Sequence, residues 1–126
     1  MEEKEFLRSI VSTPECEDFM KGLNEKASKK LEYLINKISN QQILSKDVVT
    51  KLVNTKFYEL RIKVGNQYRI IMFAIDHDNF NECTEVFFLN GFHKKATKDY
   101  PKAIKRAQKL LTEYQDEINL KEDEEE

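Results

Sequence analysis

Residues 57–64 read FYELRIKV, and in this stretch apolar side chains alternate with charged ones. A period of two predicts a β-strand with one polar face. Gly65 and Asn66, which favour turns, come next, and residues 68–75, YRIIMFAI, are apolar on both faces apart from Arg69. The second half of the chain therefore begins with a β-hairpin whose second strand lies inside a sheet.

Two arginines, Arg61 and Arg69, stand within these apolar strands. An arginine in a strand interior is costly to desolvate unless something pairs with it. A two-residue loop would pair Arg61 with Ile70 and put the arginines on opposite faces, whereas a three-residue loop (residues 64–66) would pair the two arginines on one face. We favour the three-residue loop, because two facing cations are reasonable only where an anion binds between them. The sequence thus predicts a sheet face that holds a polyanion.

The rest of the second half predicts one more strand and a helix. Residues 76–83 are polar and predict a loop, and residues 85–92 are again largely apolar and end at a basic run, HKK, at residues 93–95. The short connections imply an antiparallel meander. Pro101 stands where a helix begins, and apolar residues from 104 to 118 recur on one face of that helix.

The first half is mainly helical. Residues 5–11 suit a short first strand, and residues 12–15, STPE, carry a hydroxyl cap, a proline and an acid, which predict a helix start. Gly22 marks a break, after which apolar residues from 27 to 38 form one stripe of an amphipathic helix. Residues 45–53 have apolar positions at helical spacing and predict a shorter helical segment.

These elements predict an α+β fold. We expect an antiparallel sheet of about four strands, three of them a meander, packed against two N-terminal helices and followed by a C-terminal helix. Residues 1–119 form a single domain. Residues 120–126 are acidic and lack aromatic and β-branched side chains, so we expect a solvated, disordered tail.

Composition excludes several classes of protein. The chain has 126 residues, enough for one modest core, and no apolar run approaches the roughly 18 residues of a membrane span. The N-terminal residues lack the basic start and apolar stretch of a secretory signal, so we expect a cytoplasmic protein. Cys16 and Cys83 are the only cysteines; we interpret them as reduced and structural, without a zinc site.

The net charge of −2 conceals an asymmetry along the chain. Residues 1–55 are neutral, residues 56–109 carry +5, and residues 110–126 carry −7. The middle segment is therefore a basic unit suited to a polyanion, and the tail is acidic. An alternative interpretation has the tail folding back over the basic face as an electrostatic decoy.

Three motifs in this order resemble the RelE/ParE toxin superfamily, and most closely its phage-derived HigB-like branch. They are YELRI at residues 58–62, YRI at 68–70 and NGFHKK at 90–95. The resemblance is clear over residues 45–115 and lies only in the order of helices over residues 5–40. One residue departs from RelE itself, where a lysine stands in place of Glu59; the ELR pattern is common in the HigB-like branch.

The resemblance also implies the site residues. The family places basic residues on its second and third strands and a basic or aromatic group after the fourth. Arg61 and Arg69 match the strand positions, His93 and Lys94 match the basic run after the glycine, and Tyr100 lies near the catalytic tyrosine of some members. These five are the candidate catalytic residues. The candidate RNA-binding residues are Lys63, Lys95 and Lys98.

Cleavage of RNA by its own 2′-hydroxyl needs a base, charge stabilisation at the phosphate and an acid for the leaving oxygen. Arginine and lysine stabilise phosphate charge without a metal, and no carboxylate cluster spaced for Mg²⁺ stands out, so we expect neither metal nor cofactor. His93 is the residue of the basic run whose ordinary pKa is near neutrality; it is an acid, a base or an exposed residue without a role. Tyr100 either orients the reacting nucleotide or packs at the helix start.

The resemblance therefore implies a type II toxin: an endoribonuclease that cuts messenger RNA on the ribosome and is neutralised by a helix-turn-helix antitoxin of the HigA kind. Two alternatives stay open. One is a ParE-like inhibitor of DNA gyrase that performs no chemistry, which scattered basic residues would favour. The other is a nucleic-acid-binding module without toxicity. Fold resemblance alone does not choose among the three.

Overall fold

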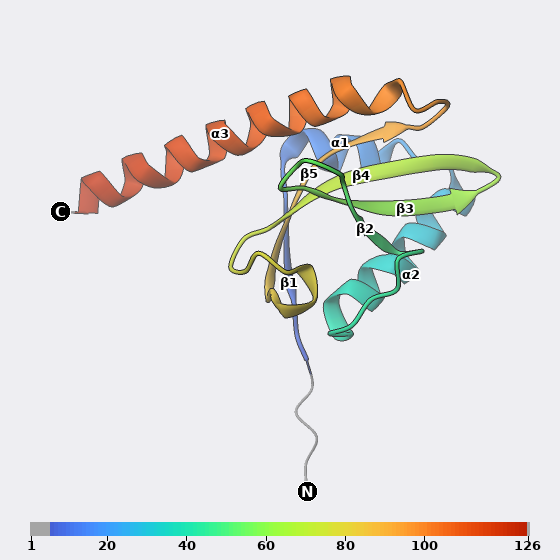
Figure 1. Cartoon of the computed structure of the whole chain (residues 1–126), viewed down its shortest axis with the longest axis horizontal. Coiled ribbons are helices and arrows are strands. Elements are labelled where there is room, and N and C mark those ends of the chain that lie inside the picture. Colours follow the sequence, from blue (N-terminus) through green and yellow to red (C-terminus); the bar gives the residue numbers. More distant parts are fainter. Residues whose placement is uncertain (1–5, 126) are drawn as a thin grey trace, which may run out of the picture.

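The computed structural model describes the backbone of residues 6–125 and the side chains of residues 6–116. Figure 1 shows a twisted sheet with helices on both sides. The elements in chain order are β1 (Ser9–Ser12), α1 (Pro14–Lys21), α2 (Glu25–Asn40), β2 (Val49–Lys51), β3 (Tyr58–Val64), β4 (Asn66–Ala74), a 3-10 turn (Phe80–Glu82), β5 (Glu85–His93) and α3 (Asp99–Glu125).

The predicted α+β class is confirmed, and the sheet is larger than expected. Its five strands lie in the order β1-β5-β4-β3-β2. Strands β2 to β5 pair antiparallel, as the short connections predicted, but β1 pairs parallel to β5. The sheet is therefore mixed. The two helices between β1 and β2 carry the chain to the opposite edge of the sheet, and the meander returns until β5 lies beside β1.

The expected helical segment at residues 45–53 is wrong, because β2 forms there as the edge strand of the sheet. Val48, Val49 and Thr50 are three successive β-branched residues, which favour extended backbone. Val49 lies opposite Leu60 of β3 and is buried. The apolar residues in this segment are therefore spaced as in a helix, but they are buried because β2 pairs with β3.

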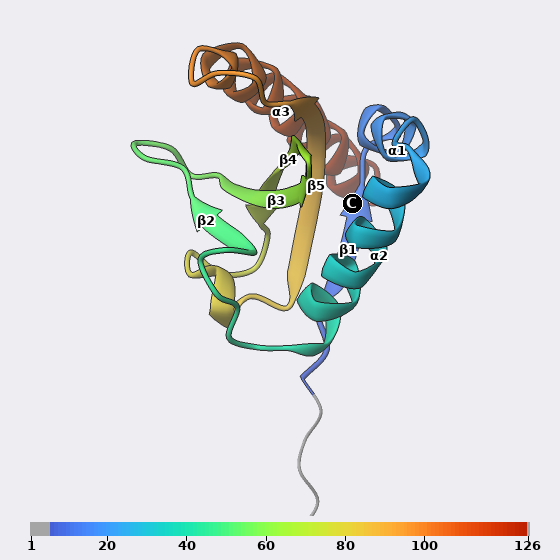
Figure 2. The same ribbon diagram turned by 90° about the vertical axis from the view of Figure 1, so that its right-hand side faces the viewer.

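Helices α1 and α2 cover one face of the sheet, as predicted (Figure 2). Thr13 caps α1, accepting a hydrogen bond from the backbone N–H of Cys16, and Pro14 occupies the first turn. Asn24 caps α2, whose predicted apolar stripe is buried against the sheet. This face therefore forms the larger apolar core of the molecule.

Helix α3 packs on the opposite face of the sheet and forms a second apolar core there. Ala107 and Leu111 of α3 lie against residues of the central strands, among them Ile71 and Leu89. The helix continues to Glu125, past the edge of the sheet, where we expected disorder from residue 120 (Figure 1). The side chains of residues 117–126 lie outside the described part of the chain, so the proposed domain boundary at residue 119 stays a prediction.

Both cysteines are buried and unpaired, which fits their structural interpretation. Burial raises the pKa of the Cys16 thiol to about 12, so this thiol stays protonated at neutral pH. Within the described part of the chain, no helix is long and apolar enough to cross a membrane.

Candidate functional site

The β3–β4 hairpin brings the two strand arginines together. Val64 pairs with Asn66 around Gly65, whose φ of 93° lies in the left-handed region that glycine adopts without strain. Arg61 consequently lies directly opposite Arg69, on the face of the sheet that carries α3. The predicted three-residue loop is confirmed, and so is the same-face placement of the arginines.

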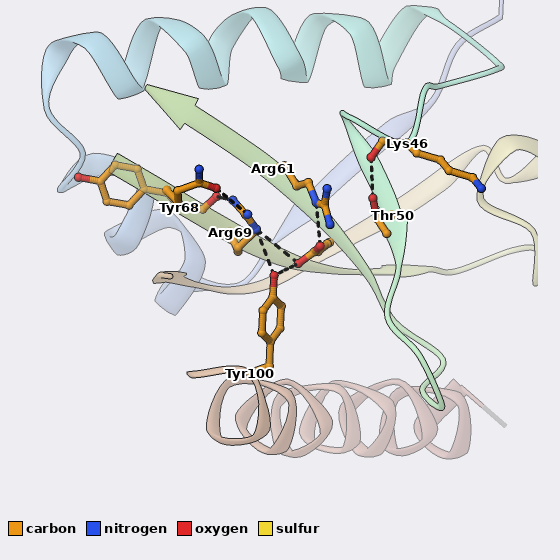
Figure 3. Close-up of polar contacts among 8 residues, drawn as sticks. Lys46, Thr50, Arg61, Tyr68, Arg69 and Tyr100 are labelled. Atoms are coloured by element: carbon orange, nitrogen blue, oxygen red, sulfur yellow. Dashed lines mark hydrogen bonds and ion pairs between the residues drawn. The ribbon is translucent and has the colours of Figure 1, made fainter. Parts of the chain in front are cut away.

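The anion between the arginines belongs to the protein itself. Glu59 is two residues from Arg61 on the same face of β3, and only 2 % of its side chain is exposed. Arg61 Nε donates to Glu59 Oε1 at 2.9 Å, and Arg69 Nε lies 3.6 Å from Glu59 Oε2 (Figure 3). Contrary to our expectation, the facing arginines do not require a bound polyanion, because Glu59 supplies the negative charge.

Arg69 is turned inward and contacts only other parts of the chain. Its side chain is 3 % exposed. Nη1 donates to the Tyr68 carbonyl at 3.0 Å, Nη2 donates to Gln67 Oε1 at 2.7 Å, and Nε donates to the Tyr100 hydroxyl at 3.2 Å. We expected a fork of donors held open for phosphate. In this conformation the fork instead organises the side chains around it.

Tyr100 reaches this group from the first turn of α3 (Figure 3). Its hydroxyl donates to Glu59 Oε2 at 2.6 Å while it accepts from Arg69. Burial raises the pKa of Tyr100, and the hydrogen bond to Glu59 raises it further, so the phenol stays protonated at neutral pH. We call Glu59, Arg61, Arg69 and Tyr100 the arginine cluster.

Two further cations, Lys63 and Lys94, lie beside Arg61 at the solvent side of the arginine cluster. Arg61 is 30 % exposed, and Lys63, two residues further along the same face of β3, is exposed. Lys94 Nζ lies 5.9 Å from the centre of the Tyr100 ring. Arg61, Lys63 and Lys94 therefore present positive charge to solvent around a buried carboxylate and a protonated phenol.

His93 does not join the arginine cluster. Arg69 lies opposite Phe92 in the β4–β5 pair, so the next residue, His93, lies on the other face of the sheet. There its ring packs on Tyr68, with ring centres 4.9 Å apart. Arg69 and His93 therefore lie on opposite faces of the sheet, and a catalytic role for His93 stays a prediction.

Lys95 and Lys98 are exposed in the loop between β5 and α3. The backbone N–H groups of Ala96 and Lys95 bind Asp99 in this loop and lower the pKa of its carboxyl. Over residues 6–116, no three His, Cys, Asp or Glu side chains gather as a metal site would require. The two loop lysines are available for contacts with a ligand.

The sequence interpretation missed Glu59 and Gln67 as members of this site. The alternation of side chains along a strand could have identified both, because residues two apart share a face: Glu59 with Arg61, and Gln67 with Arg69. Glu59 attracted attention only as a departure from RelE. Its position beside Arg61 indicates an ion pair within the strand.

Comparison with known proteins places the chain in a family. Residues 18–112 match the family described as phage derived protein Gp49-like (DUF891), and the match runs from within α1 to about the middle of α3. The chain therefore belongs to the Gp49-like family, which is part of the RelE/HigB-like toxin superfamily. No curated protein matches the chain in sequence.

Proposed function

We propose that this protein is the toxin of a type II toxin–antitoxin system and that it cleaves messenger RNA on the ribosome, as HigB-like toxins do. Membership of the Gp49-like family supports a toxin. The observation that carries the proposal is the arginine cluster, in which a protonated phenol lies between a carboxylate and a guanidinium beneath exposed cations. This arrangement supplies the donors that phosphodiester cleavage requires.

The proposed roles follow from exposure. Arg61, Lys63 and Lys94 face solvent and bind the scissile phosphate and its neighbours. Before the reaction, Arg69 and Glu59 are positioning residues that hold the Tyr100 hydroxyl in place. During cleavage Tyr100, which its raised pKa keeps protonated, turns from Glu59 and donates its proton to the leaving oxygen, while water accepts the proton of the attacking 2′-hydroxyl. None of these roles needs a metal. Lys95 and Lys98, in the loop between β5 and α3, contact RNA further from the scissile phosphate.

The proposed partners are the ribosome with its messenger RNA, and a HigA-like helix-turn-helix antitoxin. An antitoxin that covers the cations beside the arginine cluster would block the phosphate contacts directly. Acidic side chains on the antitoxin would suit this surface, since the partly exposed Arg61 and the exposed Lys63 lie on the same face of one strand.

One observation favours a second candidate function. Arg69 is bound entirely within the chain, so the arginine cluster also has the properties of a structural ion-pair network. In that case the protein is a ParE-like inhibitor of DNA gyrase that acts by binding. His93 then needs no catalytic partner, which agrees with its place on the other face.

Purified protein added to ribosomes programmed with a defined messenger RNA tests the proposal. Reverse-transcription mapping should show cleavage within the A-site codon that is absent when the ribosomes are omitted. Addition of EDTA at a concentration that leaves the ribosomes intact should not stop the reaction. A protein that arrests growth, leaves messenger RNA whole and inhibits gyrase supercoiling would contradict the proposal and support the second candidate.

A further inference from the structure

A separate pocket of about 360 Å³ lies at the C-terminal end of β5, beyond its pairing with β1, between that strand, the first turns of α3 and Glu15 of α1. Asn90 and Phe92 line it from the strand, and Lys98, Lys102 and Arg106 line it from the α3 side. In the proposed function this pocket contributes only Lys98, as a contact to RNA away from the scissile phosphate. Phe92 of this pocket packs edge-on against Tyr100, so the pocket adjoins the arginine cluster.

Asn90 leaves one polar atom unpartnered. The residue is 4 % exposed, and its Nδ2 donates to the Ala103 carbonyl at 3.1 Å, which fixes the orientation of the amide. Among the described residues, Oδ1 of Asn90 is the one buried side-chain oxygen or nitrogen without a hydrogen bond. A buried acceptor without a donor is destabilising, so this atom suits a ligand that brings an N–H group.

A β-bulge accounts for the position of Asn90. The register between β4 and β5 shifts at Ile71 and Met72, which leaves Leu89 as the extra residue. Leu89 packs in the apolar core under α3, and Asn90, paired with Ile71, lies on the same face of the sheet. Bulges redirect side chains in this way next to sites.

The charges in the pocket are unequally neutralised. Arg106 binds Glu15, with Arg106 Nε 3.0 Å from Glu15 Oε1, and Asp99 is engaged by backbone N–H groups. Over residues 6–116, Lys98 and Lys102 form no ion pair. The ammonium groups of Lys98 and Lys102 therefore give positive charge to the pocket that Asn90 also lines.

We infer that this pocket binds a nucleotide unit whose base carries an amino group. The phosphate binds Lys98 and Lys102, and the amino group donates to Asn90 Oδ1, as adenine N6 does to asparagine in other complexes. Phe92 offers an apolar edge for the base. The inference goes beyond the proposed function and does not depend on it, since a free nucleotide and a nucleotide within RNA share this chemistry.

The test uses the full-length, 15N-labelled chain and four probes: AMP, purine riboside 5′-monophosphate (which lacks the amino group), inorganic phosphate and a short oligoadenylate. Chemical-shift titration should place AMP at Lys98, Lys102 and the Asn90 side-chain amide. AMP should bind about fivefold more tightly than the analogue, the worth of one net hydrogen bond. Lys102→Gln should weaken AMP binding, and Lys105→Gln, an exposed α3 lysine outside the pocket, should not.

Oligoadenylate binding more than about tenfold tighter than AMP would identify RNA as the source of the nucleotide, and equal affinity would identify a free nucleotide. Equal affinity for AMP and its analogue, or for AMP and phosphate alone, would overturn the inference. Shifts confined to the arginine cluster would overturn it as well. No ribosome is present in this titration, so failure of the proposed cleavage is a separate outcome.

Discussion

Two arginines are buried in the described part of this molecule, and their surroundings differ in kind. Arg8, just before β1, donates to the carbonyl oxygens of six residues at 2.6–3.4 Å: Ile38, Gln41, Gln42, Phe80, Asn81 and Cys83. Its guanidinium also lies against the rings of Phe6 and Phe80. Arg69 is held mainly by side chains, namely those of Glu59, Gln67 and Tyr100.

The difference separates a structural arginine from one that we propose is functional. Backbone carbonyls cannot move without moving their segments, so Arg8 joins the end of α2 to the turn before β5. Side chains can change rotamer or protonation when a ligand arrives, so the surroundings of Arg69 can be rearranged at a lower cost. Arg8 therefore stabilises the fold at one end of the sheet, whereas Arg69 orients the polar side chains of the arginine cluster on the central strands.

Arg8→Ala should have the largest effect on stability. It leaves several buried carbonyls without donors, and we expect a loss of about 3–5 kcal/mol in the free energy of unfolding. Urea denaturation followed by circular dichroism measures this. Arg8→Lys is the matched variant: it keeps the charge but not the fork, and should lose less. A loss below about 1 kcal/mol in Arg8→Ala would show that Arg8 is not the structural link described here.

Glu59→Gln should come next, because it removes the negative charge between Arg61 and Arg69 while keeping the shape. We expect a loss of about 2 kcal/mol, since two facing cations are left without their anion. Phosphate should then raise the melting temperature of the variant more than that of the wild type. Glu85→Gln, at an exposed position, is the control. An equal response of all three proteins to phosphate would mean that Glu59 does not neutralise the pair.

Tyr100→Phe should have a smaller effect, about 1 kcal/mol at pH 7, because only the hydroxyl is lost and the packing on Phe92 remains. The effect should depend on pH. The folded-state pKa of Tyr100 is raised, so the contribution of its hydroxyl is fully present below the ordinary value of about 10 and is lost as pH rises through the folded-state value. Urea unfolding at pH 7 and above pH 10 should show the two proteins converging. A gap that widens with pH would contradict the assigned direction.

Truncation after Asn119 should have the smallest effect. Residues 120–126 are acidic and carry no aromatic or β-branched side chain with which to bury apolar surface. Scanning calorimetry should give nearly the same melting temperature for the truncated and full-length chains. A large decrease would show that this end of α3 docks on the protein.

Local patterns predicted the parts of the fold that local chemistry specifies. Gly65 and Asn66 marked the hairpin turn, and Thr13 with Pro14 marked the start of α1. The register that pairs Arg61 with Arg69 was favoured for another reason, the expectation of an anion between the two arginines. The short strand β2 was misassigned because the same apolar spacing suits a helix, and its pairing with β3 is a long-range contact. The parallel pairing of β1 with β5 likewise depends on strands far apart in sequence.

The arginine cluster was predicted only in part. Arg61 and Arg69 stood out because each is a cation in an apolar strand, and Tyr100 entered through the family resemblance. The face of His93 was not predicted, because it depends on the β4–β5 register, which short motifs do not encode. Arg8 was not predicted, since its acceptors are backbone carbonyls from two distant segments, residues 38–42 and 80–83, and nothing in the neighbouring sequence indicates them.

The most direct test of the account compares messenger RNA cleavage on programmed ribosomes by the wild type, Arg69→Ala and Lys29→Ala. Lys29 is an exposed lysine on α2, across the sheet from the arginine cluster. We predict that Arg69→Ala stays folded and loses about 10²- to 10³-fold in rate, because the Tyr100 hydroxyl is no longer held in place, while Lys29→Ala retains full activity. Full activity in folded Arg69→Ala would contradict the assignment of the arginine cluster as the functional site.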